Sequence, residues 1–514
     1  MMIAWIPELL YAERRFESGI ALVCDDAGTI TRIARVDDLK DEKKISLARR
    51  AMVPGMVNAH SHAFQRVIRG RTEYRATDRD SFWTWREMMY SAATRLSPED
   101  IYDASRMAFL EMALTGITAV GEFHYLHHTP DGTTYDDPNL LAKEVLRAAA
   151  DVGLRIALLR VAYARSGYDT EPNPKQARFI DAETAAYLKN LEALASGLRN
   201  PTVREGASID RDDNTILPDR PTPAGLPGWG PRSRVSASAW VGVAPHSVRA
   251  VPLAYLKEVI SYATERSMKV HMHVAEQPAE VSACVEEYGR TPVALLESEG
   301  LLSERFTAVH AIHVTPKSIP PFAKTGAMVC ACPTTERNLG DGVLPADEYL
   351  KNDVPICLGT DSHVQIDLLE DARELEYHLR LQKLERAILG GNPIVRVGAS
   401  SARQDPGTLP HDRVSDIADL LFDCATVNGA RSIGAPTGAL EAGKPADFFT
   451  VDLDEPTIAG ASKDDLLASI VFSSSRTAVR EVVIGGKPVV SEGQHLIQEE
   501  VIERFSDLQK RLWG

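Results

Sequence analysis

The sequence has no apolar run approaching the ~20 residues of a membrane-spanning helix. Its first residues reach Glu8 without a basic segment followed by a hydrophobic one, so no signal peptide is expected and the cytoplasm is the predicted location. Cysteine is also scarce, with six widely scattered residues among 514. Their spacing is not that of a zinc ribbon, which predicts reduced packing residues rather than a structural metal site or a disulfide framework.

Positive charge is in deficit. The chain has 57 basic against 72 acidic residues, a net charge of -15, which argues against nucleic acid or an anionic membrane as a partner. A small anionic substrate is still compatible, because a few local Arg and His residues can outweigh the global field. The length favours one large domain of barrel size together with a smaller one.

Eight short apolar or β-branched runs recur through the middle of the chain, separated by stretches with helical periodicity. They span residues 51–57, 117–123, 155–163, 241–245, 269–275, 307–314, 327–332 and 354–359. Strands that alternate with helices imply parallel βαβ units, and eight such units imply a closed (β/α)8 barrel of the TIM type.

The flanks differ from this pattern. Residues 1–50 and 440–514 contain short strand-like runs but too little apolar surface for independent cores. We expect them to combine into one small β-sandwich domain beside a barrel of residues 51–439. Two stretches near 198–238 and 390–412 have the composition of inserted loops or lids.

Histidine is concentrated at the ends of the predicted strands. If residues 51–57 lead into the first strand, His60 and His62 project to the same side because side chains alternate. Eleven of the fourteen histidines lie at or just beyond strand ends. In a barrel all those ends share one mouth, where barrel enzymes keep their chemistry. The sequence therefore predicts an active site there.

A hydrolytic zinc site needs three or four nitrogen or oxygen ligands and an open position for water. Predicted ligands from the first, fifth and eighth strands are His60, His62, His273 and Asp361. His271 shares the face of His273, so the sequence leaves their roles ambiguous, and the role of His313 is open. Glu276 follows His273 by three residues and suits a carboxylate that reaches back over the mouth, while His310 lies on the next strand.

Seven ordered motifs resemble the amidohydrolase superfamily, and within it the N-formimino-L-glutamate deiminases. The motifs lie at residues 54–66, 82–90, 122–128, 244–252, 271–277, 332–342 and 361–364. They include Pro-Gly-Met-x-Asn-x-His-Ser-His, Glu-Phe-His-Tyr-Leu-His-His and His-x-His-x-Ala-Glu-Gln. The match is poor in 165–238 and 390–412, where the chain is longer than usual for the family, and after Arg66, where extra basic residues follow.

The resemblance implies metal-dependent hydrolysis of N-formimino-L-glutamate to N-formyl-L-glutamate and ammonia, a reaction of histidine degradation. One divalent metal, Zn²⁺ by expectation, is implied because the fourth strand ends in Pro245-His246 without the lysine of binuclear members. Asp361 would bind the metal and take a proton from water, and Glu276 would carry protons to the leaving ammonia. His310 would orient the water.

The family positions that contact substrate also match. Gln65, His246 and Arg249 correspond to residues that hold a carboxylate, and Arg86 and Tyr125 to others that line the pocket. Arg249 is the first specificity candidate, because a planar guanidinium binds a carboxylate in bidentate fashion. The aromatic residues Phe82, Trp83 and Trp85 suit a lid, core packing or a dimer contact. Asn338 and Asp341 are candidates for ordering the loop after the seventh strand. The resemblance also implies a homodimer.

Two alternatives stay open at this point. One is an aminohydrolase of the same branch that acts on a nucleobase or a guanidino compound. The other is a non-catalytic scaffold, since some barrels of this superfamily have lost their metal.

Overall fold

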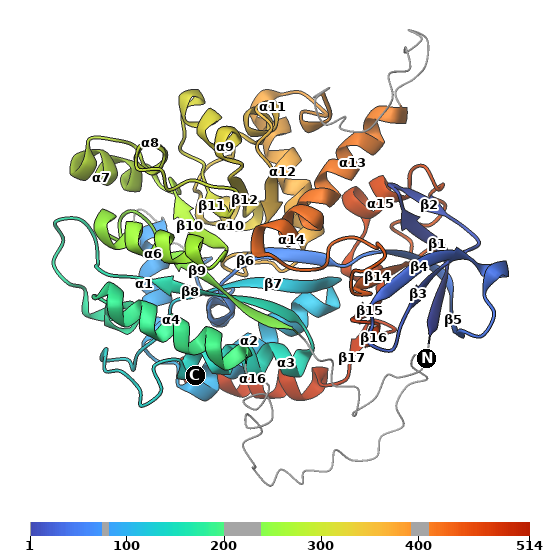
Figure 1. The fold of residues 1–514 in the computed structure, drawn as a ribbon, viewed down its shortest axis with the longest axis horizontal. Coiled ribbons are helices and arrows are strands. Elements are labelled where there is room, and N and C mark those ends of the chain that lie inside the picture. Colours follow the sequence, from blue (N-terminus) through green and yellow to red (C-terminus); the bar gives the residue numbers. More distant parts are fainter. Residues whose placement is uncertain (1, 74–81, 200–237, 392–410) are drawn as a thin grey trace.

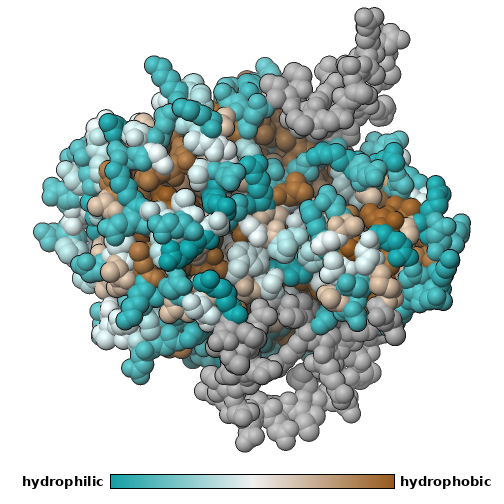
Figure 2. Space-filling view, viewed as in Figure 1, coloured by the Kyte–Doolittle hydropathy of each residue, from teal (hydrophilic) through white to brown (hydrophobic). Residues whose placement is uncertain are grey.

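The structure is a computed structural model that describes residues 2–73, 82–199, 238–391 and 411–514. The stretches near 198–238 and 390–412, which the sequence marks as insertions, lie almost entirely outside the described residues. In the part of the chain that the structure describes, no helix is both long and apolar enough to cross a membrane. The face in Figure 2 is mostly hydrophilic, with hydrophobic residues in scattered patches.

Eight parallel strands form the central sheet in consecutive order from β6 to β13 (Figure 1). They are β6 (Met56–Ser61), β7 (Ile117–His124), β8 (Arg155–Ala162), β9 (Ala239–Pro245), β10 (Val270–Val274), β11 (Phe306–His310), β12 (Met328–Ala331) and β13 (Ile356–Leu358). A parallel bridge between Ser61 and Asp361 brings the first and last strands together. The predicted (β/α)8 barrel is confirmed.

Helices cover the outside of the barrel. They are α1 (Phe82–Ala93), α2 (Pro98–Leu114), α3 (Leu140–Val152), α4 (Thr184–Arg199), α6 (Leu253–Glu265), α7 (Pro278–Tyr288), α8 (Pro292–Ser298), α9 (Pro320–Thr325), α10 (Pro333–Leu339), α11 (Ala346–Lys351), α12 (Leu368–Lys383), α13 (His411–Ala425) and α14 (Val427–Ile433). Local signals set several ends. Helix α2 begins with a capping box between Ser97 and Asp100 and has Pro98 at its first position, while α3 ends at Gly153 in the left-handed conformation.

The first barrel strand begins later than the sequence predicts. The expected strand 51–57 is divided, because its first four residues end β5 (Lys43–Pro54) of a different sheet. The chain crosses into the barrel at Gly55, where an added Cβ would lie 2.3 Å from the Thr118 Oγ1. Only glycine fits so close to the neighbouring strand, and β6 then starts at Met56.

Both ends of the chain build the second, mixed sheet, as expected. Its path is β17-β16-β15-β14-β5-β1-β3-β4, with β2 paired to β1. The remaining strands are β1 (Ile3–Ala12), β2 (Arg15–Glu17), β3 (Ile20–Cys24), β4 (Ile30–Arg35), β14 (Phe448–Asp452), β15 (Val479–Ile484), β16 (Lys487–Ser491) and β17 (Gln494–His495). Helix α15 (Leu466–Ser473) follows β14.

The C-terminal helix α16 (Gln498–Trp513) leaves the small sheet and packs against α2 of the barrel (Figure 1). Ion pairs join the two helices, with 2.9 Å between Arg106 and Glu500 and 2.8 Å between Arg504 and Asp103. All six cysteines are buried and free, as the sequence predicts.

Candidate active site

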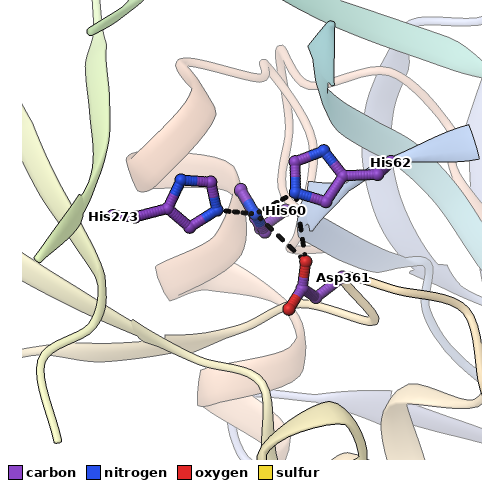
Figure 3. A group of neighbouring side chains, drawn as sticks. All are labelled: His60, His62, His273 and Asp361. Carbon is purple, nitrogen blue, oxygen red and sulfur yellow. Dashed lines mark hydrogen bonds and ion pairs between the residues drawn. The ribbon is translucent and has the colours of Figure 1, made fainter. Parts of the chain in front are cut away.

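Four side chains meet at the carboxyl end of the barrel strands (Figure 3). His60 comes from β6, His62 follows it, His273 comes from β10, and Asp361 follows β13. The Nε2 atom of His60 lies 3.2 Å from Nε2 of both His62 and His273, and Nε2 of His62 lies 3.1 Å from Oδ1 of Asp361. The four ligand atoms all lie within 4.8 Å of one another and are buried. The structure thus brings the four predicted metal ligands together.

The closure of the barrel sets the position of Asp361. Its backbone N–H donates to the His60 carbonyl at 3.1 Å, and the His62 N–H donates to the Asp361 carbonyl at the same distance. Asp361 adopts a left-handed backbone conformation with φ 45°, which is a strained geometry for a non-glycine residue and occurs often at functional sites. A Cβ at Gly359 would lie 2.7 Å from that of His60, so glycine is required for this approach.

The donor set fits a divalent cation. His62 and His273 each donate from Nδ1 to a backbone carbonyl, those of Phe123 at 2.9 Å and His246 at 3.1 Å. This tautomer leaves both Nε2 lone pairs directed into the cluster. Burial lowers the pKa of His60 to about 3 and that of His273 well below its usual value, so these imidazoles are neutral.

The one carboxylate of the cluster is ionised. Burial alone would raise the pKa of Asp361, but the adjacent His60 and His62 outweigh it and hold this pKa well below the usual range. Three imidazoles and one carboxylate form a ligand set typical of zinc and similar metals.

A second layer of titratable groups lies beside the cluster. The Nε2 atom of His310 is 3.6 Å from Oε1 of Glu276 and 3.7 Å from Oδ2 of Asp361. Burial would lower the pKa of His310, but the Glu276 and Glu336 carboxylates outweigh it and raise this pKa to about 10. Burial also raises the pKa of Glu276. These groups are therefore placed to hold and move protons next to the candidate metal ligands.

Two buried glutamates that the sequence reasoning missed hold this layer in place. Glu280, in the first turn of α7, accepts the Ala275 and Glu276 backbone N–H groups at 3.3 and 3.1 Å. Glu336, in the first turn of α10, accepts the Cys332 N–H at 2.9 Å and lies 3.3 Å from Nδ1 of His310. A glutamate in the first turn of a helix that follows a barrel strand is the signal that would have found both.

Several of the histidines at strand ends do not join the cluster. Of the two histidines on β10, only His273 lies in the cluster, whereas His271 lies 3.2 Å from the Ser432 carbonyl of α14. His313 similarly donates to the Asp341 carbonyl at 2.8 Å. Others bond backbone carbonyls in the same way, namely His127 to Val161 and His128 to Ile180. The expected convergence of eleven histidines therefore includes structural residues as well as those of the site.

A cavity opens above the cluster. All five residues predicted to contact substrate line it, namely Gln65, Arg86, Tyr125, His246 and Arg249. Glu276 and Asp361 form part of its wall. Two of the three aromatic residues that suited a lid, core packing or a dimer contact, Phe82 and Trp85, line the cavity. The third, Trp83, is partly exposed.

The loop after β12 is hydrogen-bonded to neighbouring loops through the two residues that the sequence suggested for ordering it. Asn338 donates to Glu73 at 2.9 Å, and Asp341 accepts a hydrogen bond from Gln277. Asp341 is buried beside Glu276, and its pKa is raised to about 9 by burial and then by that neighbouring carboxylate.

The cavity holds two cations that form no direct ion pair among the described residues, although the Glu280 and Glu276 carboxylates act on Arg249 at longer range. Neither Arg86 nor Arg249 forms an ion pair there, and the Arg86 Nε and Arg249 Nη1 atoms are buried without a hydrogen-bond partner in the described residues. The Arg86 guanidinium stacks over the Trp83 ring at 4.3 Å. Gln65 donates to the Tyr125 hydroxyl at 2.8 Å, and its buried Oε1 has no hydrogen-bond partner among the described residues. Buried unpaired guanidinium groups favour an anionic ligand.

Comparison with known proteins identifies the family of this chain. The chain belongs to the amidohydrolase family, whose model matches residues 51–208 and 232–489. It is 35% identical to the formimidoylglutamate deiminase of Pseudomonas aeruginosa over 456 residues, 88% of each chain. It is 24% identical to the 5-methylthioadenosine/S-adenosylhomocysteine deaminase of Pyrococcus abyssi over 481 residues, 93% of this chain and 92% of that one.

Solved structures share the whole architecture. An amidohydrolase from Brucella melitensis superposes with a TM-score of 0.80 at 30% identity, covering 100% of both chains. A zinc-bound adenosine deaminase from Xanthomonas campestris gives a TM-score of 0.74 at 21% identity over 99% of this chain and 98% of that one. The second likeness shows the fold alone. The resemblance predicted from the motifs is confirmed.

Proposed function

We propose that the protein hydrolyses N-formimino-L-glutamate to N-formyl-L-glutamate and ammonia, using one divalent metal ion, with zinc as the expected ion. The observation that carries this proposal is that one cavity contains both the His-His-His-Asp cluster and two guanidinium groups that form no ion pair among the described residues. A substrate with two carboxylates and a hydrolysable imino carbon matches both parts of that cavity. The likeness to a formimidoylglutamate deiminase supports the same substrate.

His60, His62, His273 and Asp361 would hold the metal ion. The chemistry supplied by such an ion when bound is a lowering of the pKa of water, from about 15.7 to about 7 for zinc, which makes a nucleophile available at neutral pH. Asp361 would accept the proton of the attacking water. His310, whose Nε2 faces Glu276 and Asp361, would orient this water by a hydrogen bond.

Glu276 would move protons during the reaction. Water adds to the formimino carbon, the bond from that carbon to the terminal nitrogen breaks, and the nitrogen leaves as ammonia after gaining the proton that Glu276 carries. The formyl group stays on the glutamate nitrogen. A pKa raised by burial suits a carboxyl group that must both accept and release a proton near neutral pH.

Arg249, His246 and Gln65 would hold one substrate carboxylate, and Arg86 and Tyr125 would complete the pocket. A neutral nucleobase in this cavity would leave the buried guanidinium nitrogens of Arg86 and Arg249 without an anionic hydrogen-bond acceptor, which opposes binding. The small dicarboxylate is therefore the partner we propose. The homodimer and the cytoplasmic location stay predictions.

The test is ammonia release by the zinc-loaded protein with N-formimino-L-glutamate, guanidino acids and adenine nucleosides as separate substrates. We expect kcat/KM to be highest for formiminoglutamate. Turnover of nucleosides alone would refute the proposal in favour of a nucleobase deaminase. A protein that binds no metal and releases ammonia from none of the compounds would be a non-catalytic scaffold.

A further inference from the structure

A buried amide bridges two tyrosine hydroxyl groups at the cavity. The side-chain Nε2 of Gln176 donates to the Tyr90 hydroxyl at 2.8 Å and to the Tyr163 hydroxyl at 2.6 Å. All three side chains are buried, and both tyrosines line the cavity. Gln176 lies in the 3-10 helix Pro174–Phe179, within the stretch 165–238 where the motif match to the family is poor. This residue thus reaches the site from a segment outside the seven motifs.

The hydrogen-bond count leaves protons free at these hydroxyl groups. An amide nitrogen has two N–H donors, and both are used here, so each tyrosine oxygen already accepts one hydrogen bond. Neither hydroxyl donates to a carbonyl or carboxylate among the described residues. Even if one hydroxyl donates to the other, at least one O–H remains to be donated to a molecule in the cavity.

The location of the pair identifies what it would meet. His246 contacts the metal-ligand candidate His273, with 4.9 Å between ring centroids, and Tyr163 lies one ring further on, 4.7 Å from His246. The other tyrosine of the pair, Tyr90, contacts Arg86, whose guanidinium lies 5.5 Å from the Tyr90 ring centroid. The Tyr163 ring is therefore separated from His273 by one side chain, and the tyrosine pair lies near the Arg86 and Arg249 cations.

We infer that Tyr90 and Tyr163, held by Gln176 and flanked by Arg86, form the binding site for the substrate carboxylate farther from the reacting carbon. The inference rests on the proposed function for the identity of the substrate. Hydroxyl donors beside a guanidinium suit a carboxylate, because each oxygen accepts more than one hydrogen bond. In formiminoglutamate the distal carboxylate is the one that reaches away from the imino group. Tyr90 and Tyr163 are then specificity-determining residues, and Gln176 is a positioning residue.

The experiment compares two substrates that differ in that carboxylate alone, N-formimino-L-glutamate and N-formimino-L-2-aminobutyrate. The variants are Tyr90→Phe and Tyr163→Phe, which remove one hydroxyl each. We expect each variant to lose about 10-fold or more in kcat/KM on formiminoglutamate, mainly through KM, because a hydrogen bond to a charged group is lost. On the aminobutyrate compound each variant should stay within about 2-fold of the wild type. An equal loss on both substrates, or no loss on either, would overturn the inference.

The matched control is Tyr187→Phe. Tyr187 is a fully buried tyrosine of the same barrel whose hydroxyl donates to the Arg160 carbonyl at 2.8 Å and which is not part of the cavity lining. We expect its kinetic parameters on both substrates to match the wild type. A loss on formiminoglutamate equal to that of the cavity variants would show that any buried hydroxyl has this effect and would overturn the inference.

Binding of glutarate, a dicarboxylate without the imino group, separates this inference from the proposed function. Calorimetry should show glutarate bound by the zinc-loaded wild type and about 10-fold weaker in Tyr163→Phe. If formiminoglutamate is not hydrolysed but glutarate binding shows this pattern, the proposed function fails and the carboxylate site stands. Equal glutarate affinity in wild type and Tyr163→Phe, or no binding at all, would overturn the site. Gln176→Met should also weaken glutarate binding. Tighter binding would mean that the amide oxygen of Gln176 had been accepting hydrogen bonds from the tyrosine hydroxyl groups, which would contradict the inference.

Discussion

Arg249→Met tests the assignment of the cavity to an anionic substrate. The guanidinium lies in the cavity, its Nη1 is buried, and it has no carboxylate partner in the part of the chain that the structure describes. Methionine has a similar length and no charge, so it fills the space without offering a hydrogen bond. The variant therefore removes the proposed substrate contact and no ion pair among the described residues.

The expected loss follows from truncating one partner of a desolvated charge pair, which costs about 2–5 kcal/mol, or roughly 30- to 5000-fold in kcat/KM. If the carboxylate is held equally in ground and transition states, the loss falls on KM. The effect on stability is expected to be small. The nearby Arg249 charge contributes, after burial, to lowering the pKa of Arg86, so the two cations repel each other. Burial would lower the pKa of Arg249, but Tyr163, Tyr90, Glu280 and Glu276 outweigh it. Removing the charge therefore ends both this repulsion and those attractions, and Tm should stay close to that of the wild type.

The assay is ammonia release from formiminoglutamate, together with thermal unfolding of the same preparations. Arg249→Lys serves as a graded variant, because it keeps the charge but loses the planar fork, and should recover part of the activity. Arg305→Met, at a half-buried arginine outside the cavity whose guanidinium donates to a backbone carbonyl, is the matched control and should match the wild type. Unchanged kcat/KM in Arg249→Met would refute the carboxylate assignment. A clear fall in Tm with unchanged activity would show instead that Arg249 has a structural role.

Three further predictions concern the metal, the proton carrier and pH. Zinc added to chelator-treated protein should restore activity and raise Tm, because it binds only the folded state. Most of this rise in Tm should be lost in Asp361→Asn. An equal rise in that variant would exclude Asp361 as a ligand. Glu276→Gln should lower kcat about 10²- to 10⁴-fold with zinc content unchanged, measured by ammonia release and metal analysis; full kcat would exclude Glu276 as the proton carrier. Burial lowers the pKa of His495 from 6.5 to about 4, so the unfolded state binds more protons between these values and the free energy of unfolding falls as pH drops through this window. In denaturant unfolding, the loss of unfolding free energy between pH 6.5 and pH 4 should be up to about 3 kcal/mol larger for the wild type than for His495→Gln. Identical pH profiles would contradict the lowered pKa of His495.

The barrel and its chemistry were predictable because both rest on short-range patterns. Alternating strands and helices give the parallel sheet, and polar residues that follow each strand must lie at one rim of that sheet. His60 and His62 share a face through the two-residue period of a strand, which their 3.2 Å separation confirms. The start of the first strand was less predictable, since the apolar run across Gly55 serves two sheets and only strand pairing divides it.

The choice among similar residues needed contacts between distant parts of the chain. His271 and His273 are equivalent by alternation, and they differ only because the first meets Ser432 of α14 while the second meets His60. Glu280 and Glu336 are ordinary helix-start residues in the sequence and become part of the site through their hydrogen bonds to neighbouring loops and to His310.

The sequence by itself determined which chemical groups the mouth of the barrel offers, because strand period and strand order are local properties. Only the tertiary structure decided which groups meet, which cations stay unpaired in the described residues, and that Gln176 joins two tyrosines, one of them 86 residues away in the chain. The physical reason is that hydrogen bonding and desolvation depend on neighbours in space, and these neighbours are set by the closure of the barrel and the packing of its loops.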